Sequence, residues 1–142
     1  LLDVMQQRIA RDPRLAGRVH LLGKVAHARV ETLMQAADLF VAGSHAESCG
    51  YALLEALACG VAPVVTDIPA FRALTGNGRV GRLWPCGDAA QLAAALVDVA
   101  ANRPSPAQVR AHFDATLSFA ALGRRWADAY AQVLDDRQWR AG

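Results

Sequence analysis

The sequence predicts an α/β domain built on a doubly wound parallel sheet. Short apolar runs alternate with segments of helical periodicity along most of the chain. The runs are continuous and lack period-two alternation, which is typical of parallel strands buried on both faces. With 142 residues, 54% of them apolar and 20% charged, the composition suits one globular domain with a real core.

The first third of the chain is expected to contain two helices and two strands. Residues 1–11 place apolar side chains at helical spacing and stop before a proline. Residues 18–23 (RVHLLG) are a short apolar run ended by glycine, which predicts a buried strand. Helical spacing returns over 28–38, and 39–43 (LFVAG) predict another buried strand. Because the chain begins within an expected helix and without Met, we expect a piece of a longer protein.

The middle of the chain continues the alternation. Residues 51–60 are helical, with Gly60 as the C-terminal stop. A β-branched strand is expected over 61–67, a short helix led by proline over 69–75, and a short strand over 80–85. Between the last two, GNGRVG matches a dinucleotide-binding pattern literally. That motif must leave a strand and open a helix, and here the order is reversed, so we interpret it as a turn.

Helices close the chain. Residues 88–102 form an Ala-rich segment with Asp88 as the expected N-cap, and 105–113 and 118–139 follow as two further helices. His112 is expected on the surface of the first of these, whereas Trp126 and Tyr130 are four residues apart on the last and are expected to pack. No linker divides the chain, so 1–142 is predicted to be a single domain.

Charge and cysteine content exclude several classes of function. The net charge of +2 is too balanced to predict a nucleic-acid partner. Three cysteines without C-x-x-C spacing indicate reduced thiols and a cytoplasmic location, with the parent protein at a membrane surface as an alternative. His45, Glu47 and Cys49 alternate as metal ligands would, but no fourth ligand is suggested, so no metal is expected. No secretory signal or transmembrane segment is visible.

The segment GSHAESCG, residues 43–50, leaves an expected strand and enters an expected helix. In doubly wound sheets ligands bind at this edge. Gly50 would let a ligand approach the backbone, and the amides of Gly50, Tyr51 and Ala52 would be free donors for an anion. The carboxylates of Glu47 and Glu55 would repel a phosphate unless sugar hydroxyls bind them. These residues therefore predict a pocket for a polyol phosphate.

Several ordered motifs resemble one family over more than half of the chain. These are VHLLGKV, ADLFVAGS, ESCGYALLEALACGVAPVVTD and GRLWPCGD, between Val19 and about Val99. The chain is similar to the C-terminal, nucleotide-sugar-binding domain of the retaining GT-B glycosyltransferases of the glycosyl transferases group 1 family. Glu47 and Glu55 fall where that family carries its E-x7-E pair. The resemblance implies the truncated, Rossmann-like C-terminal half of a GT-B fold and a transferase of polysaccharide biosynthesis.

The same resemblance implies a role for each residue of the site. Glu47 would be the catalytic carboxylate, holding hydroxyls of the donor sugar near the reacting carbon, and Glu55 would accept the ribose hydroxyls. The remaining donor-binding positions are Cys49, Gly50, Tyr51 and Ala52, through their amides, and Gly23, Lys24 and Val25, against the base. The family generally needs no metal or cofactor, and its donor is a nucleoside-diphosphate sugar. The missing N-terminal domain of the parent chain would bind the acceptor.

The chain departs from the family pattern in places that matter for specificity. Ser48-Cys49 replaces a frequent Gly-Phe beside the sugar, and Gly43-Ser44 replaces a usual Pro-Ser. The Arg and Lys that neutralise the diphosphate in the family are not matched by Lys24, Arg29 or Arg72. The 142 residues alone are therefore expected to be inactive.

Three alternatives stay open. A nucleotide-sugar epimerase of the same fold would turn over the donor without an acceptor. A glycoside hydrolase would use Glu47 and Glu55 as its pair and need no nucleotide. A non-catalytic binding or scaffold domain would keep the fold and bind no nucleotide.

Overall fold

The structure is a computed structural model that describes the backbone of residues 2–140 and the side chains of residues 2–135. Contacts divide the chain into two compact units, Leu1–Val30 and Glu31–Gly142, which are described separately. Helix α2 (His27–Gln35) contains the boundary between them. It overlaps the helix expected over 28–38, beginning one residue earlier and ending three residues earlier.

The first unit contains helix α1 (Leu2–Arg11), as expected, followed by turns. The strand predicted over 18–23 is wrong, because this segment is irregular. Leu21 and Leu22 are 41% and 58% exposed, so they do not form the buried surface that the apolar run suggested. A strand requires a neighbouring strand for its backbone hydrogen bonds, and no strand of the described residues pairs with this segment.

The second unit is built on a three-stranded parallel sheet in the order β1-β2-β3. Its strands are β1 (Leu39–Ala42), β2 (Ala62–Thr66) and β3 (Arg82–Trp84). In the register, Val41 lies beside Val64, and Val65 lies beside Leu83. Every residue of the central strand β2 is buried, whereas β1 at the edge is only partly buried. The α/β parallel class predicted from the sequence is confirmed.

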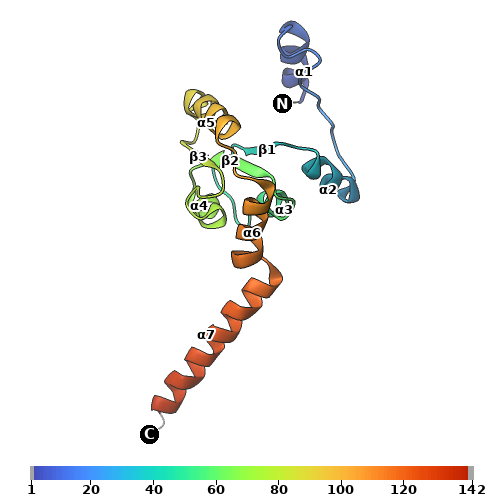
Figure 1. Cartoon of the computed structure of the whole chain (residues 1–142). Helices are drawn as coiled ribbons and strands as arrows, with labels where there is room; N and C mark the ends of the chain where they lie inside the picture. The colour runs from blue at the N-terminus through green and yellow to red at the C-terminus, as the bar shows by residue number, and fades with distance from the viewer. Residues whose placement is uncertain (1, 141–142) are drawn as a thin grey trace. The chain divides into compact units, whose positions relative to one another are not determined.

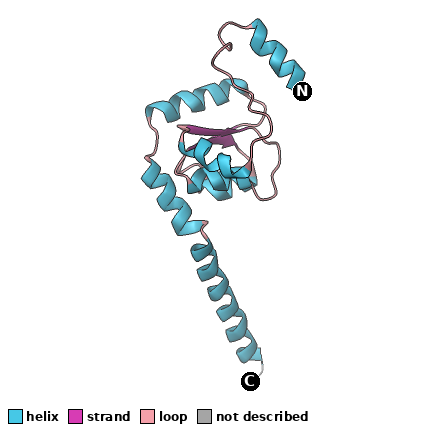
Figure 2. Cartoon of the chain, turned by 90° about the vertical axis from the view of Figure 1, so that its right-hand side faces the viewer, coloured by secondary structure: helices cyan, strands magenta, loops and turns pink. Residues whose placement is uncertain are grey.

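Helices cover both faces of this sheet. Helix α5 (Ala89–Ala101) packs on β2 and β3, and α3 (Tyr51–Ala58) packs on β1 and β2. Figures 1 and 2 both place α5 on one side of the strands, and α3 and α4 (Pro69–Thr75) on the other. The core joins side chains of all these layers, including Leu53, Leu57, Val64, Val65, Phe71, Val99 and Val109.

The turns between elements follow the sequence signals. Gly60 ends α3 with a φ of 77°, and a Cβ there would lie 2.8 Å from the Pro106 carbonyl oxygen. Gly76 is the left-handed C-cap of α4 and continues into a turn that leads to β3. The interpretation of GNGRVG as a turn is therefore confirmed, since a helix precedes it and a strand follows.

The last two helices are α6 (Pro106–Thr116) and α7 (Phe119–Arg140). Trp126 and Tyr130 on α7 contact each other with ring centroids 6.0 Å apart, although each remains 63% exposed. His112 on α6 does not lie on the surface, so that prediction is wrong: it is only 9% exposed. Its ring packs against the end of α4, where the Leu74 carbonyl oxygen accepts a hydrogen bond from Nε2 at 2.8 Å.

Candidate functional site

The candidate site is the loop over residues 43–50, between β1 and α3. It follows the carboxyl end of β1, and the ends of β2 and β3 lie at the same edge because the three strands are parallel. This is the edge at which ligands bind in doubly wound sheets. The fold therefore places the loop where the sequence analysis expected it.

Two hydrogen bonds connect the Glu47 carboxylate to the core. The Ser44 hydroxyl donates to Glu47 Oε1 at 2.8 Å. The Thr66 hydroxyl, at the end of β2, donates to the carbonyl oxygen of Ser44 at 2.5 Å. Thr66 is fully buried and Glu47 is exposed, so a rigid part of the sheet orients a carboxylate that solvent and ligands reach.

Gly50 is required by the conformation of the loop. Its φ of 63° lies in the left-handed region, which a side chain disfavours. A Cβ at this position would lie 2.9 Å from Cδ1 of Leu74 and 3.4 Å from Cε1 of Phe71. Side chains of α4 therefore occupy the space that a Cβ at position 50 would need. The glycine serves close packing of α3 against α4, and the approach of a ligand to its backbone stays a prediction.

The N-terminus of α3 lacks the side-chain cap that α5 and α6 have. Asp88 accepts a hydrogen bond from the Gln91 amide at α5, and Ser105 forms a capping box with Gln108 at α6. By contrast, Gly50 at the N-cap of α3 offers no side chain to the first-turn amides. These donors and the positive end of the helix dipole favour an anion.

A pocket of about 260 Å³ opens at this helix end. It is lined by Phe40, Ala42, Glu47, Ser48, Cys49, Gly50, Tyr51, Ala52, Leu53 and Phe71. Five of the nine residues proposed from the sequence therefore meet in one cavity. Its volume is below the roughly 300–1,000 Å³ of pockets for drug-sized ligands. It would therefore hold a smaller group than a drug-sized ligand.

The other predicted residues lie outside this cavity. Glu55 is half-buried on α3, one helical turn beyond Tyr51, and does not line the pocket. Gly23, Lys24 and Val25 belong to the first unit, so their contact with a nucleotide base stays a prediction.

Residues beyond β2 and β3 complete the surroundings of the loop. Cys86 Sγ, just after β3, lies 3.0 Å from His45 Nδ1. Asp67 follows Thr66 and accepts a hydrogen bond from Arg72 Nη2 at 2.8 Å; this guanidinium lowers the pKa of the Asp67 carboxyl. Asp67 and Arg72 therefore neutralise each other beside the site.

Among the described residues, no group of three or more His, Cys, Asp or Glu could hold a metal ion. In the same part of the chain, no helix combines the length and apolar character needed to cross a membrane.

Sequence reasoning missed three residues whose contacts involve this loop. Ser44 donates to Glu47, Thr66 donates to the Ser44 carbonyl oxygen, and Cys86 lies beside His45. The sequence carried one signal for Thr66, a hydroxyl residue at the last position of a buried strand. Its partner is 22 residues away, and Cys86 is 41 residues from His45. Only the order of the strands brings these pairs together.

Comparison with known proteins assigns most of the chain to one family. Residues 5–113 match the family described as Glycosyl transferases group 1. Phosphatidyl-myo-inositol mannosyltransferase from Mycolicibacterium smegmatis is 36% identical over 121 residues, which are 84% of this chain and 30% of that protein. The protein of that name from Mycobacterium leprae is 40% identical over 89 residues, 62% of this chain and 24% of the relative.

One solved structure shows the same fold. Sucrose-phosphate synthase from Thermosynechococcus elongatus superposes with a TM-score of 0.70 at 23% identity, covering 94% of this chain and 34% of that one. The expected GT-B-like, Rossmann-type half is thus confirmed. The chain spans less than a third of the length of the curated relatives described above.

Proposed function

The chain belongs to the glycosyl transferases group 1 family, and from this premise we propose that it is the donor-binding part of a retaining hexosyltransferase. The donor would be a nucleoside-diphosphate sugar, and the product would keep the anomeric configuration. The observation that carries the proposal is the pocket at the N-terminus of α3, where uncapped amides and the Glu47 carboxylate line one cavity.

The lining residues offer two kinds of group, and these match the two parts of a sugar phosphate. The uncapped amides of α3 suit the diphosphate oxygens. Glu47, oriented by Ser44, suits the sugar hydroxyls, because an ionised carboxylate accepts hydrogen bonds and donates none. Helix-end amides that bind the diphosphate in the ground state also stabilise the charge that develops on it as the sugar leaves.

The roles of Glu55 and of Gly23, Lys24 and Val25 belong to the same proposal. Glu55 would accept the ribose hydroxyls from its position one turn into α3, and the backbone of residues 23–25 would contact the base. The acceptor would bind to the segment that corresponds to the rest of the longer relatives. We therefore propose that residues 1–142 bind the donor without transferring sugar. Because two relatives are named mannosyltransferases, a mannose donor is the first to test.

Amide shifts of the labelled chain, titrated with UDP, GDP and ADP and with their hexose conjugates, test the donor site. We expect one nucleotide series to shift Gly50, Tyr51 and Ala52, with a Kd in the millimolar range, about −4 kcal/mol. Glu47→Gln should weaken binding of the sugar conjugate more than binding of the free nucleotide, whereas Glu55→Gln should weaken binding of both.

Glu31→Gln is the matched control, because Glu31 is an exposed helical glutamate of the same unit whose carboxylate binds Gln35. Binding that is saturable and equal in all three variants would contradict the assignment of both glutamates. Sugar transfer by the purified 142-residue chain would contradict the proposed inactivity of this part alone.

A further inference from the structure

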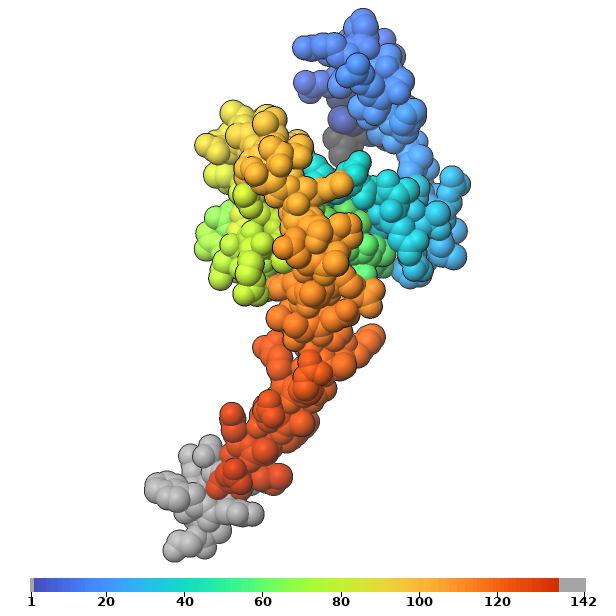
Figure 3. All heavy atoms as spheres, viewed as in Figure 1, coloured from blue at the N-terminus to red at the C-terminus, as the bar shows by residue number. Residues whose placement is uncertain are grey.

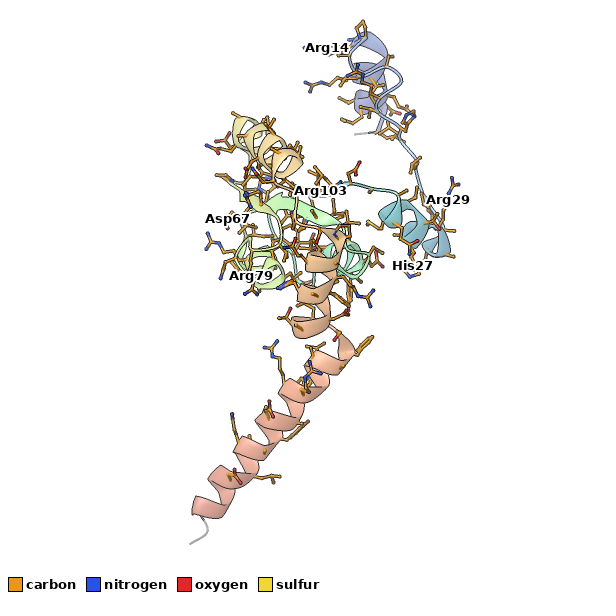
Figure 4. The ribbon with its side chains drawn as sticks, in the orientation of Figure 1. Arg14, His27, Arg29, Asp67, Arg79 and Arg103 are labelled. Atoms are coloured by element: carbon orange, nitrogen blue, oxygen red, sulfur yellow. The ribbon has the colours of Figure 1, made fainter. Side chains whose placement is uncertain are left out.

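Arg79 differs from the other arginines around the sheet. Four arginines of the second unit each contact an aspartate, in the pairs Arg72–Asp67, Arg82–Asp98, Arg103–Asp38 and Arg110–Asp114. Arg79, in the turn between α4 and β3, contacts no carboxylate among the described residues and is labelled in Figure 4. Its positive charge is therefore available to an external anion.

The buried imidazole of His112 orients this guanidinium without neutralising it. His112 Nε2 donates to the Leu74 carbonyl oxygen at 2.8 Å, so Nδ1 is left as an acceptor. Arg79 Nη2 lies 3.4 Å from that Nδ1. Gly76 leaves room for the arrangement, since a Cβ there would stand 3.0 Å from Arg79 Nη2. A guanidinium has five N–H donors, and this contact uses one of them.

A pocket of about 360 Å³ lies beside these two side chains, where the turn before β3 meets α6. In Figure 3 the yellow-green surface of the turn region borders the orange surface of α6. Val80, Pro104, Ala111 and Ala115 give the pocket an apolar wall, and no Asp or Glu lines it. Its volume falls within the range of small-molecule sites.

We propose that this pocket binds a small organic phosphate ester, with the phosphate on Arg79 and the organic part against the apolar wall. The planar guanidinium matches phosphate oxygens and binds them through paired hydrogen bonds. Inorganic phosphate would fill only part of the cavity. The site shares no lining residue with the pocket at α3, so it is a second site and does not depend on the proposed donor chemistry.

The test is a titration of the 15N-labelled chain with phenyl phosphate, inorganic phosphate and phenol at constant ionic strength, which keeps charge screening equal. Backbone amides and the Arg79 Nε–H report binding. We expect phenyl phosphate to shift Gly76, Gly78 and the amides of α6 in a saturable manner. Inorganic phosphate should bind several-fold more weakly, and phenol should leave these signals unchanged.

Variants decide whether Arg79 is responsible. Arg79→Gln should weaken the binding of phenyl phosphate at least tenfold. Arg79→Lys should have an intermediate affinity, because it keeps the charge but loses the planar donors. Arg124→Gln removes one exposed positive charge from α7 and should change nothing. Equal affinity of Arg79→Gln and the unchanged protein, or shifts confined to Gly50, Tyr51 and Ala52, would overturn the proposal.

Discussion

Replacing Thr66 with valine separates the orientation of Glu47 from the stability of the fold. Valine keeps the shape and strand preference of threonine but removes the hydroxyl that donates to the Ser44 carbonyl oxygen at 2.5 Å. A net hydrogen bond contributes about 0.5–1.5 kcal/mol, and an acceptor left without its donor costs somewhat more. Because Thr66 is fully buried, we expect Thr66→Val to lower the free energy of unfolding by about 1–2 kcal/mol.

Thr75→Val is the matched control. Thr75 is equally buried, and its hydroxyl donates to the Phe71 carbonyl oxygen at 2.7 Å and accepts from the Gly78 amide at 3.0 Å. Its loss should cost about 1–3 kcal/mol, since two hydrogen bonds disappear. None of these contacts involves the loop over residues 43–50, so Thr75→Val should destabilise the domain and leave the Glu47 carboxylate in place.

Urea unfolding and ligand titration together test this reasoning. Both variants should shift the urea midpoint downward with unchanged slope. Only Thr66→Val should also shift the amide signals of residues 44–49 in the native protein. It should weaken the binding of a nucleotide sugar by about 3- to 10-fold, or roughly 0.6–1.4 kcal/mol. If Thr66→Val loses stability but keeps the loop shifts and the affinity, then Thr66 does not orient Glu47.

Three further predictions concern single positions. Gly50→Ala should cost about 1–3 kcal/mol in urea unfolding, because its left-handed φ of 63° disfavours a side chain and its Cβ would stand 2.9 Å from a leucine methyl carbon. Gly87→Ala is the control, because Gly87 has a φ of 82° but no atom within 4 Å of the added Cβ. It should lower the free energy of unfolding by less, and an equal loss in both variants would contradict the role of crowding at position 50. Cys59 should react most slowly of the three cysteines with iodoacetamide near pH 8, since burial raises the pKa of its thiol. Mass spectrometry of the peptides measures the order of alkylation, and faster labelling of Cys59 would contradict the prediction. The Arg82 guanidinium lowers the pKa of the Asp98 carboxyl below its ordinary 3.8, so this pair stabilises the fold above that value and the contribution is lost as the pH falls through the lower, folded-state pKa. Urea midpoints between pH 2 and 6 should accordingly depend less on pH in Asp98→Asn, and unchanged pH dependence would contradict the coupling.

Local signals determined most of the second unit. The apolar runs at 39–43, 61–67 and 80–85 each contain a strand of the sheet, and helical spacing located α3 to α7 within a few residues. The Asp88 cap formed as expected, because capping involves residues three apart. The position of the ESCG segment before a helix likewise located the candidate loop at the sheet edge, since a strand followed by a loop and a helix fixes the edge of a parallel sheet.

The same kind of signal failed where a residue's environment depends on distant partners. The run at 18–23 resembles the other strands in composition but pairs with none in the described residues. His112 has the sequence context of a surface helix, yet the Leu74 carbonyl oxygen, 38 residues earlier, accepts its hydrogen bond within the core. Strand pairing and helix docking decide such cases, and neither leaves a periodic pattern in the segment itself.

By itself, the sequence determined the class of the fold, the order of the elements in the second unit and the loop that carries Glu47. Helical periods, caps and glycine turns are properties of neighbouring residues. Only the tertiary structure decided which residues orient the Glu47 carboxylate and which side chain lies beside the guanidinium of Arg79. Parallel strands bring the end of β2 beneath the loop after β1, so Thr66 reaches Ser44. Helix α6 packs on α3, and its His112 contacts both the Leu74 carbonyl oxygen and Arg79. These contacts arise from packing between segments that are far apart in the chain.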